Sequence, residues 1–347
     1  DLFAVEGYPT TWGAEPYRDQ TIDVTATVVS KLDSAGAVLL GKATLGALAW
    51  GDVWFGGRTR NPWNPEEGSS GSSAGSAAAV SAGLVPFALG TETLGSIVSP
   101  STRTGVTGLR PSFGRVSRHG AMALSWSMDK PGPICRRAED CAFVFDAIRG
   151  PDGDDRTVVD RPFPYRHGVD LSKMEIGYLE SAFADDTTEA GRLDRRTLDV
   201  LRELGADLVP ISLPDRPAGA MGFILSAEGA AAFDRLTRSD RDSLMVRQEA
   251  AAWPNVFRSS RFIPAVEYLQ ANRLRTLLGR EMREALSGVD AYVSPSFGGG
   301  NLLVTNLTGQ PCVVVPNGFP EPDGPRSITF CAPMYREAAA LGVAEAY

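Results

Sequence analysis

Residues 71–100 read "GSSAGSAAAVSAGLVPFALGTETLGSIVSP", an apolar stretch enclosed by two segments rich in serine and glycine. The first serine segment, Glu67–Ser76, holds five serines and three glycines in ten residues. That composition is typical of a flexible linker. A linker separates domains, whereas this segment joins a tryptophan-rich stretch to an apolar one. We therefore interpret it as part of a folded site.

A phosphate-binding loop is a second interpretation of the first serine segment. The positions of lysine and glycine in the segment disfavour this interpretation. A P-loop needs a lysine directly after its last glycine, and Glu67–Ser76 contains no lysine. A dinucleotide-binding loop needs the spacing GxGxxG, which Gly68, Gly71 and Gly75 do not have. Nucleotide binding is therefore not expected.

The pattern of the second serine segment, Thr91–Val98, is typical of a tight turn that carries a nucleophilic serine. Gly95 allows a backbone conformation that a β-carbon forbids, and Ser96 follows it directly. The backbone N–H groups of Thr93, Leu94, Gly95 and Ser96 could then form an oxyanion hole. A plain turn serine is the alternative. A serine of the first segment, brought close by its small neighbours, could relay a proton.

The base that would activate such a serine is not a histidine. The chain has only two, His119 and His167, both in polar or proline-rich stretches, so a Ser-His-Asp triad is not expected. A buried, neutral lysine is the better candidate because desolvation lowers the lysine pKa.

Composition limits the partners. The net charge of −8 disfavours nucleic acid and anionic membranes, and no run of 18 apolar residues is present. We expect a small-molecule substrate, a monomer or homodimer, and neither metal nor other cofactor. The four cysteines, Cys135, Cys141, Cys312 and Cys331, lack zinc-ligand spacing and are expected to be reduced thiols in the cytoplasm. The sequence leaves secretion open.

Alternating helix and strand patterns predict an α/β sandwich. The expected helices include Asp23–Ala35, Gly75–Ala82, Glu139–Ile148 and Ala265–Leu286, and residues 37–41 read as a buried strand. In Glu139–Ile148 we expect Phe143, Val144 and Ile148 to face inward. Residues 214–260 are less regular and are expected to form a helical cap over the sheet. We expect residues 1–347 to form one domain.

The two serine segments together resemble the amidase signature family, whose members are Ser–cis-Ser–Lys amide hydrolases. The resemblance rests on residues 71–101, "GVTGLRPSFGRVSR" after them, "AGAVLLGKATLGALA" and "GRTRNPWNP" before them, and "NLTGQPCVVVPNGF" near the end. It implies an α/β/α sandwich with a large mixed sheet covered by helices.

The resemblance also implies roles for individual residues. Ser96 is the expected nucleophile and Ser72 the bridging serine, 24 positions earlier. Ser72 is expected to follow a cis peptide bond from Gly71. Thr91 and Ser73 match residues that support the two segments.

The catalytic lysine of the family does not lie within this sequence. The family pattern implies a lysine immediately before Asp1. Lys42 matches a different, non-catalytic lysine, and Lys130 lies in a stretch that runs near the pocket in relatives. Both are weaker candidates for the base.

Two positions in the second serine segment bear on the substrate. Leu94 and Val98 stand where many relatives have glycine and arginine, which favours a peptide-amidase-like branch and disfavours dicarboxylic monoamides. Trp126 and Ser127 are expected in the substrate pocket. The sequence thus predicts a hydrolase of a small aryl or alkyl amide or carbamate. The alternatives are a glutaminase-type subunit of a tRNA-dependent amidotransferase, and a catalytically inactive binding protein.

Overall fold

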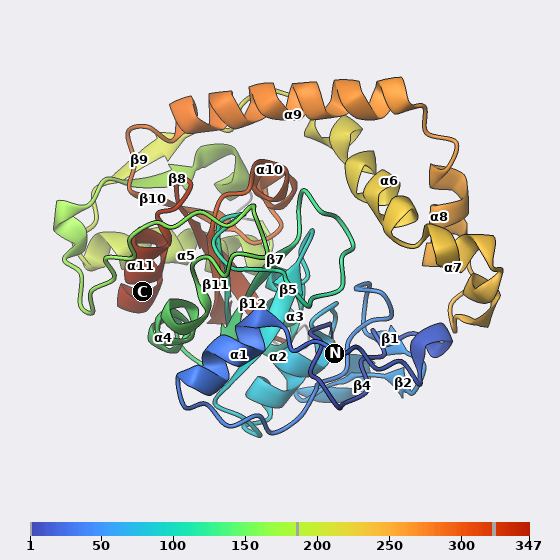
Figure 1. The fold of residues 1–347 in the computed structure, drawn as a ribbon. Coiled ribbons are helices and arrows are strands. Elements are labelled where there is room, and N and C mark those ends of the chain that lie inside the picture. Colours follow the sequence, from blue (N-terminus) through green and yellow to red (C-terminus); the bar gives the residue numbers. More distant parts are fainter. Residues whose placement is uncertain (1, 185–186, 321–323) are drawn as a thin grey trace.

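One eight-stranded sheet runs through the computed structural model, which describes residues 2–184, 187–320 and 324–347 (Figure 1). Its strand order is β5-β7-β6-β11-β12-β10-β8-β9. The pairs β10·β8 and β8·β9 are parallel and the other pairs are antiparallel. The expected large mixed sheet of an α/β fold is therefore confirmed.

The strands of this sheet are β5 (Phe87–Glu92), β6 (Thr107–Arg110), β7 (Lys130–Cys135), β8 (Ile176–Leu179), β9 (Leu208–Ile211), β10 (Ala291–Pro295), β11 (Cys312–Gly318) and β12 (Arg326–Cys331). Two small hairpins pair β1 (Val53–Trp54) with β2 (Gly57–Arg58) and β3 (Arg60–Asn61) with β4 (Asn64–Gly68).

The α-helices are α1 (Thr27–Ser34), α2 (Ala74–Ser81), α3 (Val98–Thr104), α4 (Ala138–Ile148), α5 (Glu189–Glu203), α6 (Phe223–Ala232), α7 (Asp234–Arg238), α8 (Trp253–Ser260), α9 (Ala265–Ala285), α10 (Asn301–Thr308) and α11 (Glu337–Ala346). Short 3-10 turns span Glu15–Tyr17, Leu171–Lys173, Glu180–Phe183, Ala218–Met221 and Arg241–Leu244. No helix in the described ranges is both long and apolar enough to cross a membrane.

Successive residues of the central strands face two separate apolar layers, as the two-residue repeat of a strand requires. Val313 and Phe330 pack in the layer that includes side chains of α1, α4, α5 and α11. Val314 and Cys331 pack in the opposite layer with side chains of α3, α9 and α10. Burial on both faces explains the nearly continuous apolar sequence of β11.

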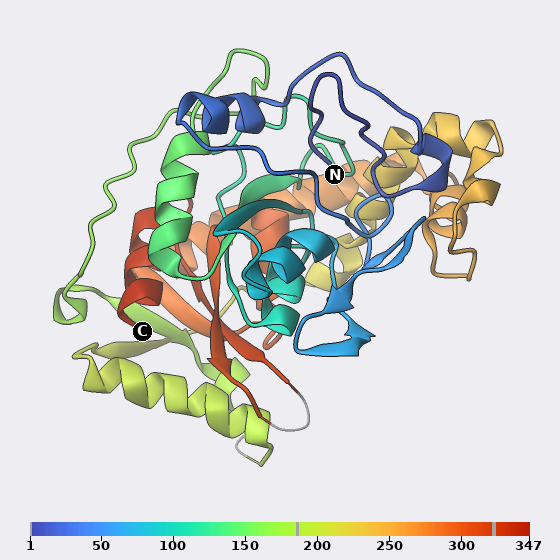
Figure 2. The ribbon, with the colours of Figure 1, turned by 90° about the horizontal axis from the view of Figure 1, so that it is seen from below.

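Helices α6, α7 and α8 lie beyond the edge of the sheet, and α9 runs from them back across it (Figures 1 and 2). These three helices contain most of residues 223–260. Phe257 stacks on Trp253 with ring centroids 4.9 Å apart, and the Trp253 indole donates a 2.9 Å hydrogen bond to the Leu48 carbonyl. The helical group is thereby fixed to the segment that precedes the first serine segment.

Several local predictions hold and two are wrong. Helices α2 and α4 lie where the pattern predicted them, and α1 begins four residues later than expected. Phe143 is exposed, and Phe145 takes the inward position instead. Residues 37–41 form no strand, and Val38 is 81 % exposed, because no neighbouring strand in the described chain pairs with them.

Phe330 offers a test of this core. It is fully buried on β12, opposite Val293 of β10 and Val313 of β11. We expect Phe330→Ala to lower the free energy of unfolding by about 3–5 kcal/mol, because it removes buried apolar contacts and leaves a cavity. Phe262→Ala is the matched control, since Phe262 is 87 % exposed. It should change the value by at most about 0.5 kcal/mol. Urea unfolding measures both, and equal effects would contradict the assignment of the core.

Candidate active site

The second serine segment leaves the sheet at the end of β5 and turns into α3. Gly95 has a φ of +85°, the left-handed conformation that a glycine adopts at little cost. The Gly95 carbonyl accepts a 2.7 Å hydrogen bond from Ser99 N, which starts the first turn of α3. Ser96 is therefore held between a strand end and a helix start, with 8 % of its surface exposed.

A buried carboxylate fixes this turn. Glu92 accepts hydrogen bonds from Ile97 N at 2.9 Å and Val98 N at 3.0 Å. Its other oxygen accepts from Arg110 Nη1 at 2.8 Å and Asn306 Nδ2 at 2.7 Å. Burial alone would raise the pKa of Glu92, but the charge of Arg110 and these hydrogen bonds lower the pKa to about 2.

The backbone of the turn keeps donors available. Within the part of the chain that the structure describes, the N–H groups of Leu94, Gly95 and Ser96 donate to no protein acceptor. Ile97 and Val98, the next two residues, use their N–H groups on Glu92. The N–H groups of Ile97 and Val98 thus stabilise the turn, whereas those of Leu94, Gly95 and Ser96 are available to donate to a bound oxyanion.

The first serine segment is packed closely against residues 44–52. The cis peptide bond that the resemblance implies joins Gly71 to Ser72. A β-carbon on Gly71 would lie 1.8 Å from the Gly51 carbonyl oxygen, so only glycine fits there. Ser70 N donates to Asp52 Oδ2 at 3.1 Å, and Gly46 N donates to the Ser72 carbonyl at 3.2 Å. These contacts exclude a flexible linker.

Ser73 joins the two serine segments. Its N–H donates to the Ser96 carbonyl at 3.2 Å. Its hydroxyl donates to the Thr91 carbonyl at 3.2 Å and accepts from Thr91 N at 3.1 Å. A β-carbon at Gly90 would lie 2.8 Å from this hydroxyl, which explains the glycine there. The residue after Ser72 is therefore hydrogen-bonded to Ser96 itself.

The Ser72 hydroxyl is buried beside this junction. Among the described residues it has no hydrogen-bond partner. Most buried hydroxyl groups in folded proteins are hydrogen-bonded. In the described chain this hydroxyl therefore makes no hydrogen bond to the Ser96 hydroxyl, and it is available to relay a proton.

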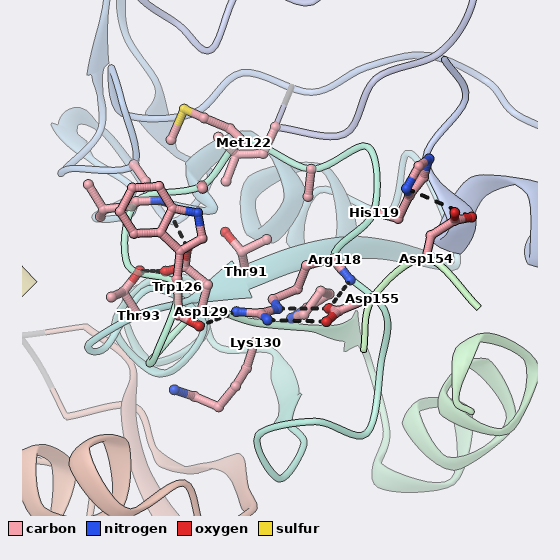
Figure 3. A pocket seen from close by; sticks show the side chains of 16 residues that line it. Thr91, Thr93, Arg118, His119, Met122, Trp126, Asp129, Lys130, Asp154 and Asp155 are labelled. Carbon is pink, nitrogen blue, oxygen red and sulfur yellow. Dashed lines mark hydrogen bonds and ion pairs between the residues drawn. The ribbon is translucent and has the colours of Figure 1, made fainter. Parts of the chain in front are cut away.

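The two lysines considered for the base have other contacts. Lys42 Nζ donates to the Pro9 carbonyl at 2.7 Å and to Thr10 Oγ1 at 2.6 Å, and burial lowers its pKa to about 8. Lys130 Nζ donates to the Met128 carbonyl. Burial and the nearby Arg110 lower the pKa of Lys130 to about 7. Its ammonium group points away from Thr91 and Trp126 (Figure 3).

A cavity of about 270 Å³ adjoins the second serine segment (Figure 3). Thr91 and Thr93 line it, together with Trp126, whose surface is 51 % exposed. Trp126 lines this cavity, whose lining does not include Ser96 or Ser72, and its role in a substrate pocket stays a prediction. Ser127 is not among the lining residues, because its hydroxyl is held by Glu228 and Arg275.

Two carboxylates of this region were missed by the sequence analysis. Glu92 holds the turn, and Asp129 Oδ1 accepts a 2.6 Å hydrogen bond from Thr93 Oγ1. Glu92 lies in the stretch "GTETLGSIV", and an acidic residue in such an apolar stretch indicates a buried carboxylate with hydrogen-bond partners. Asp129 carries no comparable signal in the sequence. In the described chain, no three His, Cys, Asp or Glu side chains are grouped to hold a metal ion.

Comparison with known proteins gives consistent results. The family model described as Amidase matches residues 1–341. The A subunit of glutamyl-tRNA(Gln) amidotransferase from Roseiflexus castenholzii is 34 % identical over 394 positions, covering 100 % of this chain and 80 % of the relative. The solved structure of the corresponding Thermotoga maritima protein superposes with a TM-score of 0.85 at 28 % identity, covering 99 % of this chain and 80 % of that one. Peptide amidase from Stenotrophomonas maltophilia gives 0.84 at 27 % identity, covering 100 % and 80 %.

Glu92 predicts a measurable pH dependence of stability. Its pKa falls from 4.5 in an exposed side chain to about 2 in the folded protein, so folding favours the ionised form. The stabilisation is complete above about pH 4.5 and is lost as the pH falls toward 2. Between pH 7 and pH 3 the free energy of unfolding of the wild type should therefore fall by about 2 kcal/mol more than that of Glu92→Gln.

At pH 7 the same substitution should lower the free energy of unfolding by about 3–5 kcal/mol, because it leaves Arg110 buried without its counter-ion. Urea unfolding of both proteins at pH 7 and pH 3 measures both effects. Parallel pH profiles would show that Glu92 is not ionised in the folded state.

Proposed function

This chain belongs to the amidase family, and we propose that it hydrolyses the C–N bond of an amide through an acyl-enzyme formed on Ser96. The observation that carries the proposal is the Ser73 junction. It fixes the Ser72 residue beside Ser96, and the same turn holds three backbone N–H groups that have no protein acceptor in the described chain. A nucleophile, a proton relay and an oxyanion hole are the parts that acyl transfer needs.

In the first half-reaction the Ser96 oxygen attacks the amide carbonyl carbon. The Ser96 proton passes to the Ser72 oxygen, and the Ser72 proton passes to the base. The carbonyl oxygen becomes an oxyanion and accepts hydrogen bonds from the N–H groups of Leu94, Gly95 and Ser96. Loss of one such donor typically lowers the rate about 10²- to 10³-fold.

The intermediate then collapses and the C–N bond breaks. The leaving nitrogen takes a proton from the Ser72 hydroxyl, which is reprotonated by the base. Water then attacks the carbonyl carbon of the acyl-enzyme, and its proton passes through Ser72 to the base. The carboxylic acid leaves and Ser96 regains its proton. In this scheme the base is the lysine of the family's Ser–cis-Ser–Lys pattern. No cofactor enters any step.

For the substrate we propose a small amide whose acyl group enters the cavity under Trp126. The apolar part of its lining includes Met122, Leu124 and Ala49. This apolar part suits an aryl or alkyl group. The rest of the lining is polar and includes Arg118, His119, Lys130, Asp154 and Asp155. Val98, in place of the arginine of many relatives, gives no carboxylate clamp at that position.

A glutamine-hydrolysing subunit of a tRNA-dependent amidotransferase is the second candidate. It is favoured by the sequence relatives, which include such amidotransferase proteins from several bacteria at 31–34 % identity. The chemistry at Ser96 is the same in both candidates. They differ in the amide and in the need for partner subunits.

Substitution of the nucleophile tests the shared chemistry. We expect Ser96→Ala to lower amide hydrolysis by about 10⁴-fold or more, since the acyl-enzyme cannot form. In the wild type, a fluorophosphonate probe should label the peptide that contains Ser96, as mass spectrometry would show. Ser99→Ala, one helical turn further on, is the matched control and should keep both labelling and turnover. Labelling of another residue, or equal turnover in Ser96→Ala, would disprove the proposal.

A substrate panel separates the two candidates. A free amidase should release ammonia from benzamide or propionamide as an isolated protein, and more slowly from glutamine. A glutaminase subunit should prefer glutamine, and its rate should rise when partner subunits copurify. Ammonia release measured on the isolated protein and on any copurified complex decides between them.

A further inference from the structure

The loop that carries Trp126, residues 124–129, contains no helix or strand, yet it is held at both ends. Asp129 Oδ2 accepts hydrogen bonds from Leu124 N at 2.8 Å and Ser125 N at 2.9 Å, which closes the loop on itself. The other oxygen of Asp129 accepts from Thr93. The loop is therefore joined to the turn that holds Ser96.

Glu228, on α6, binds both neighbours of Trp126. One oxygen accepts from the Ser125 hydroxyl at 2.6 Å and from Ser127 N at 3.1 Å. The other oxygen accepts from the Ser127 hydroxyl at 2.7 Å and from the Tyr268 hydroxyl at 2.7 Å. All four acceptor positions of the buried carboxylate are thus in use. Burial would raise the pKa of Glu228, but these hydrogen bonds lower it, so the group is ionised.

Arg275, on α9, completes the contact from the other side. Its Nη1 donates to the Ser127 hydroxyl and its Nη2 to the Ser127 carbonyl, both at 2.6 Å. Its Nε donates to the Leu307 carbonyl at the end of α10. Since Ser127 donates its own proton to Glu228, every polar atom of that residue is engaged. Two helices therefore hold the backbone on either side of Trp126.

The Trp126 side chain itself lies at the cavity, half exposed, beside Thr93 and Met122 (Figure 3). An indole held on a fixed backbone loses little conformational freedom when a ring packs on it. Aromatic rings gain from such stacking beyond the area that they bury.

We propose that Glu228 is a positioning residue for substrate selection, which fixes Trp126 as one wall of a subsite for an aromatic acyl group. This inference rests on the proposed function and specifies its substrate class. Glu228 does not touch the reacting atoms. It fixes the Ser125–Ser127 backbone and thereby the position of Trp126. The indole would contact the acyl group, which is the part in which an aryl amide differs from a small alkyl amide.

The test compares two amides in the full-length protein. Glu228→Gln keeps the size of the side chain but replaces one acceptor oxygen with an amide NH₂ that cannot accept. We expect its KM for benzamide to rise about tenfold while its KM for propionamide changes less than threefold. Trp126→Ala should give the same selective loss. Because both variants act through one indole, the double variant should lose no more than Trp126→Ala alone.

The matched control is Glu281→Gln on α9, an ionic partner of Arg216 away from the cavity. It should leave the benzamide-to-propionamide ratio unchanged. A general structural effect of Glu228→Gln would lower kcat for both amides equally, and that result would overturn the proposal. Additive effects of Glu228→Gln and Trp126→Ala would overturn it as well.

Binding without turnover gives an independent result. In a Ser96→Ala background, calorimetry should show benzamide binding that weakens about tenfold on adding Glu228→Gln. If the wild type hydrolyses neither amide but this binding pattern is seen, the proposed function fails and the aromatic subsite stands. If hydrolysis occurs but Glu228→Gln leaves benzamide binding unchanged, the subsite proposal fails alone.

Discussion

The buried Glu92 carboxylate is the interaction on which the arrangement of the site depends. It joins β5 to the start of α3 through two backbone N–H groups, to β6 through Arg110, and to α10 through Asn306. A buried ion pair gains little net stability over an apolar pair, because both charges lose their hydration. This ion pair instead fixes geometry. Four donors hydrogen-bond to the one carboxylate, and these bonds hold the turn between β5 and α3 in a defined conformation. Arg110 extends the constraint to the Gln310 carbonyl before β11.

The parts of the site that the sequence predicts are those set by short-range sterics. The glycines at positions 71 and 95 are fixed by a close backbone approach and by a positive φ, and the small residues of α2 by the contact of Gly75 with Thr44. A close approach that leaves no room for a β-carbon requires glycine, and that requirement is visible in the sequence even though Gly51 and Thr44 lie well before these glycines in the chain. The apolar runs of strands β10, β11 and β12 reflect burial on both faces of the sheet.

The parts that the sequence does not reveal depend on partners far along the chain. Asn306 lies 214 positions from Glu92, and Glu228 lies 103 positions from Ser125, so neither pair leaves a local pattern. Phe143 and Phe145 have equal hydrophobicity, but the helical repeat puts Phe145 on the buried face of α4 with Cys141 and Ile148, so this error was avoidable. Residues 37–41 have the composition of a buried strand but no pairing partner in the described chain, and strand propensity without a partner does not make a strand.

One residue, Asp129, joins the turn of Ser96 to the loop of Trp126. Asp129 accepts from Thr93 with one oxygen and closes the Trp126 loop with the other. A shift of the loop backbone would therefore displace the turn that carries Ser96. Ser125 and Ser127 are bound to Glu228, and Met128 is buried in the core. Leu124 and Trp126 of this loop both line the cavity, and the Trp126 carbonyl accepts a hydrogen bond from Arg118 Nη1. Substitution of Trp126 would change the shape of the cavity, while the hydrogen bonds from Glu92 and Asp129 that hold the turn of Ser96 would remain.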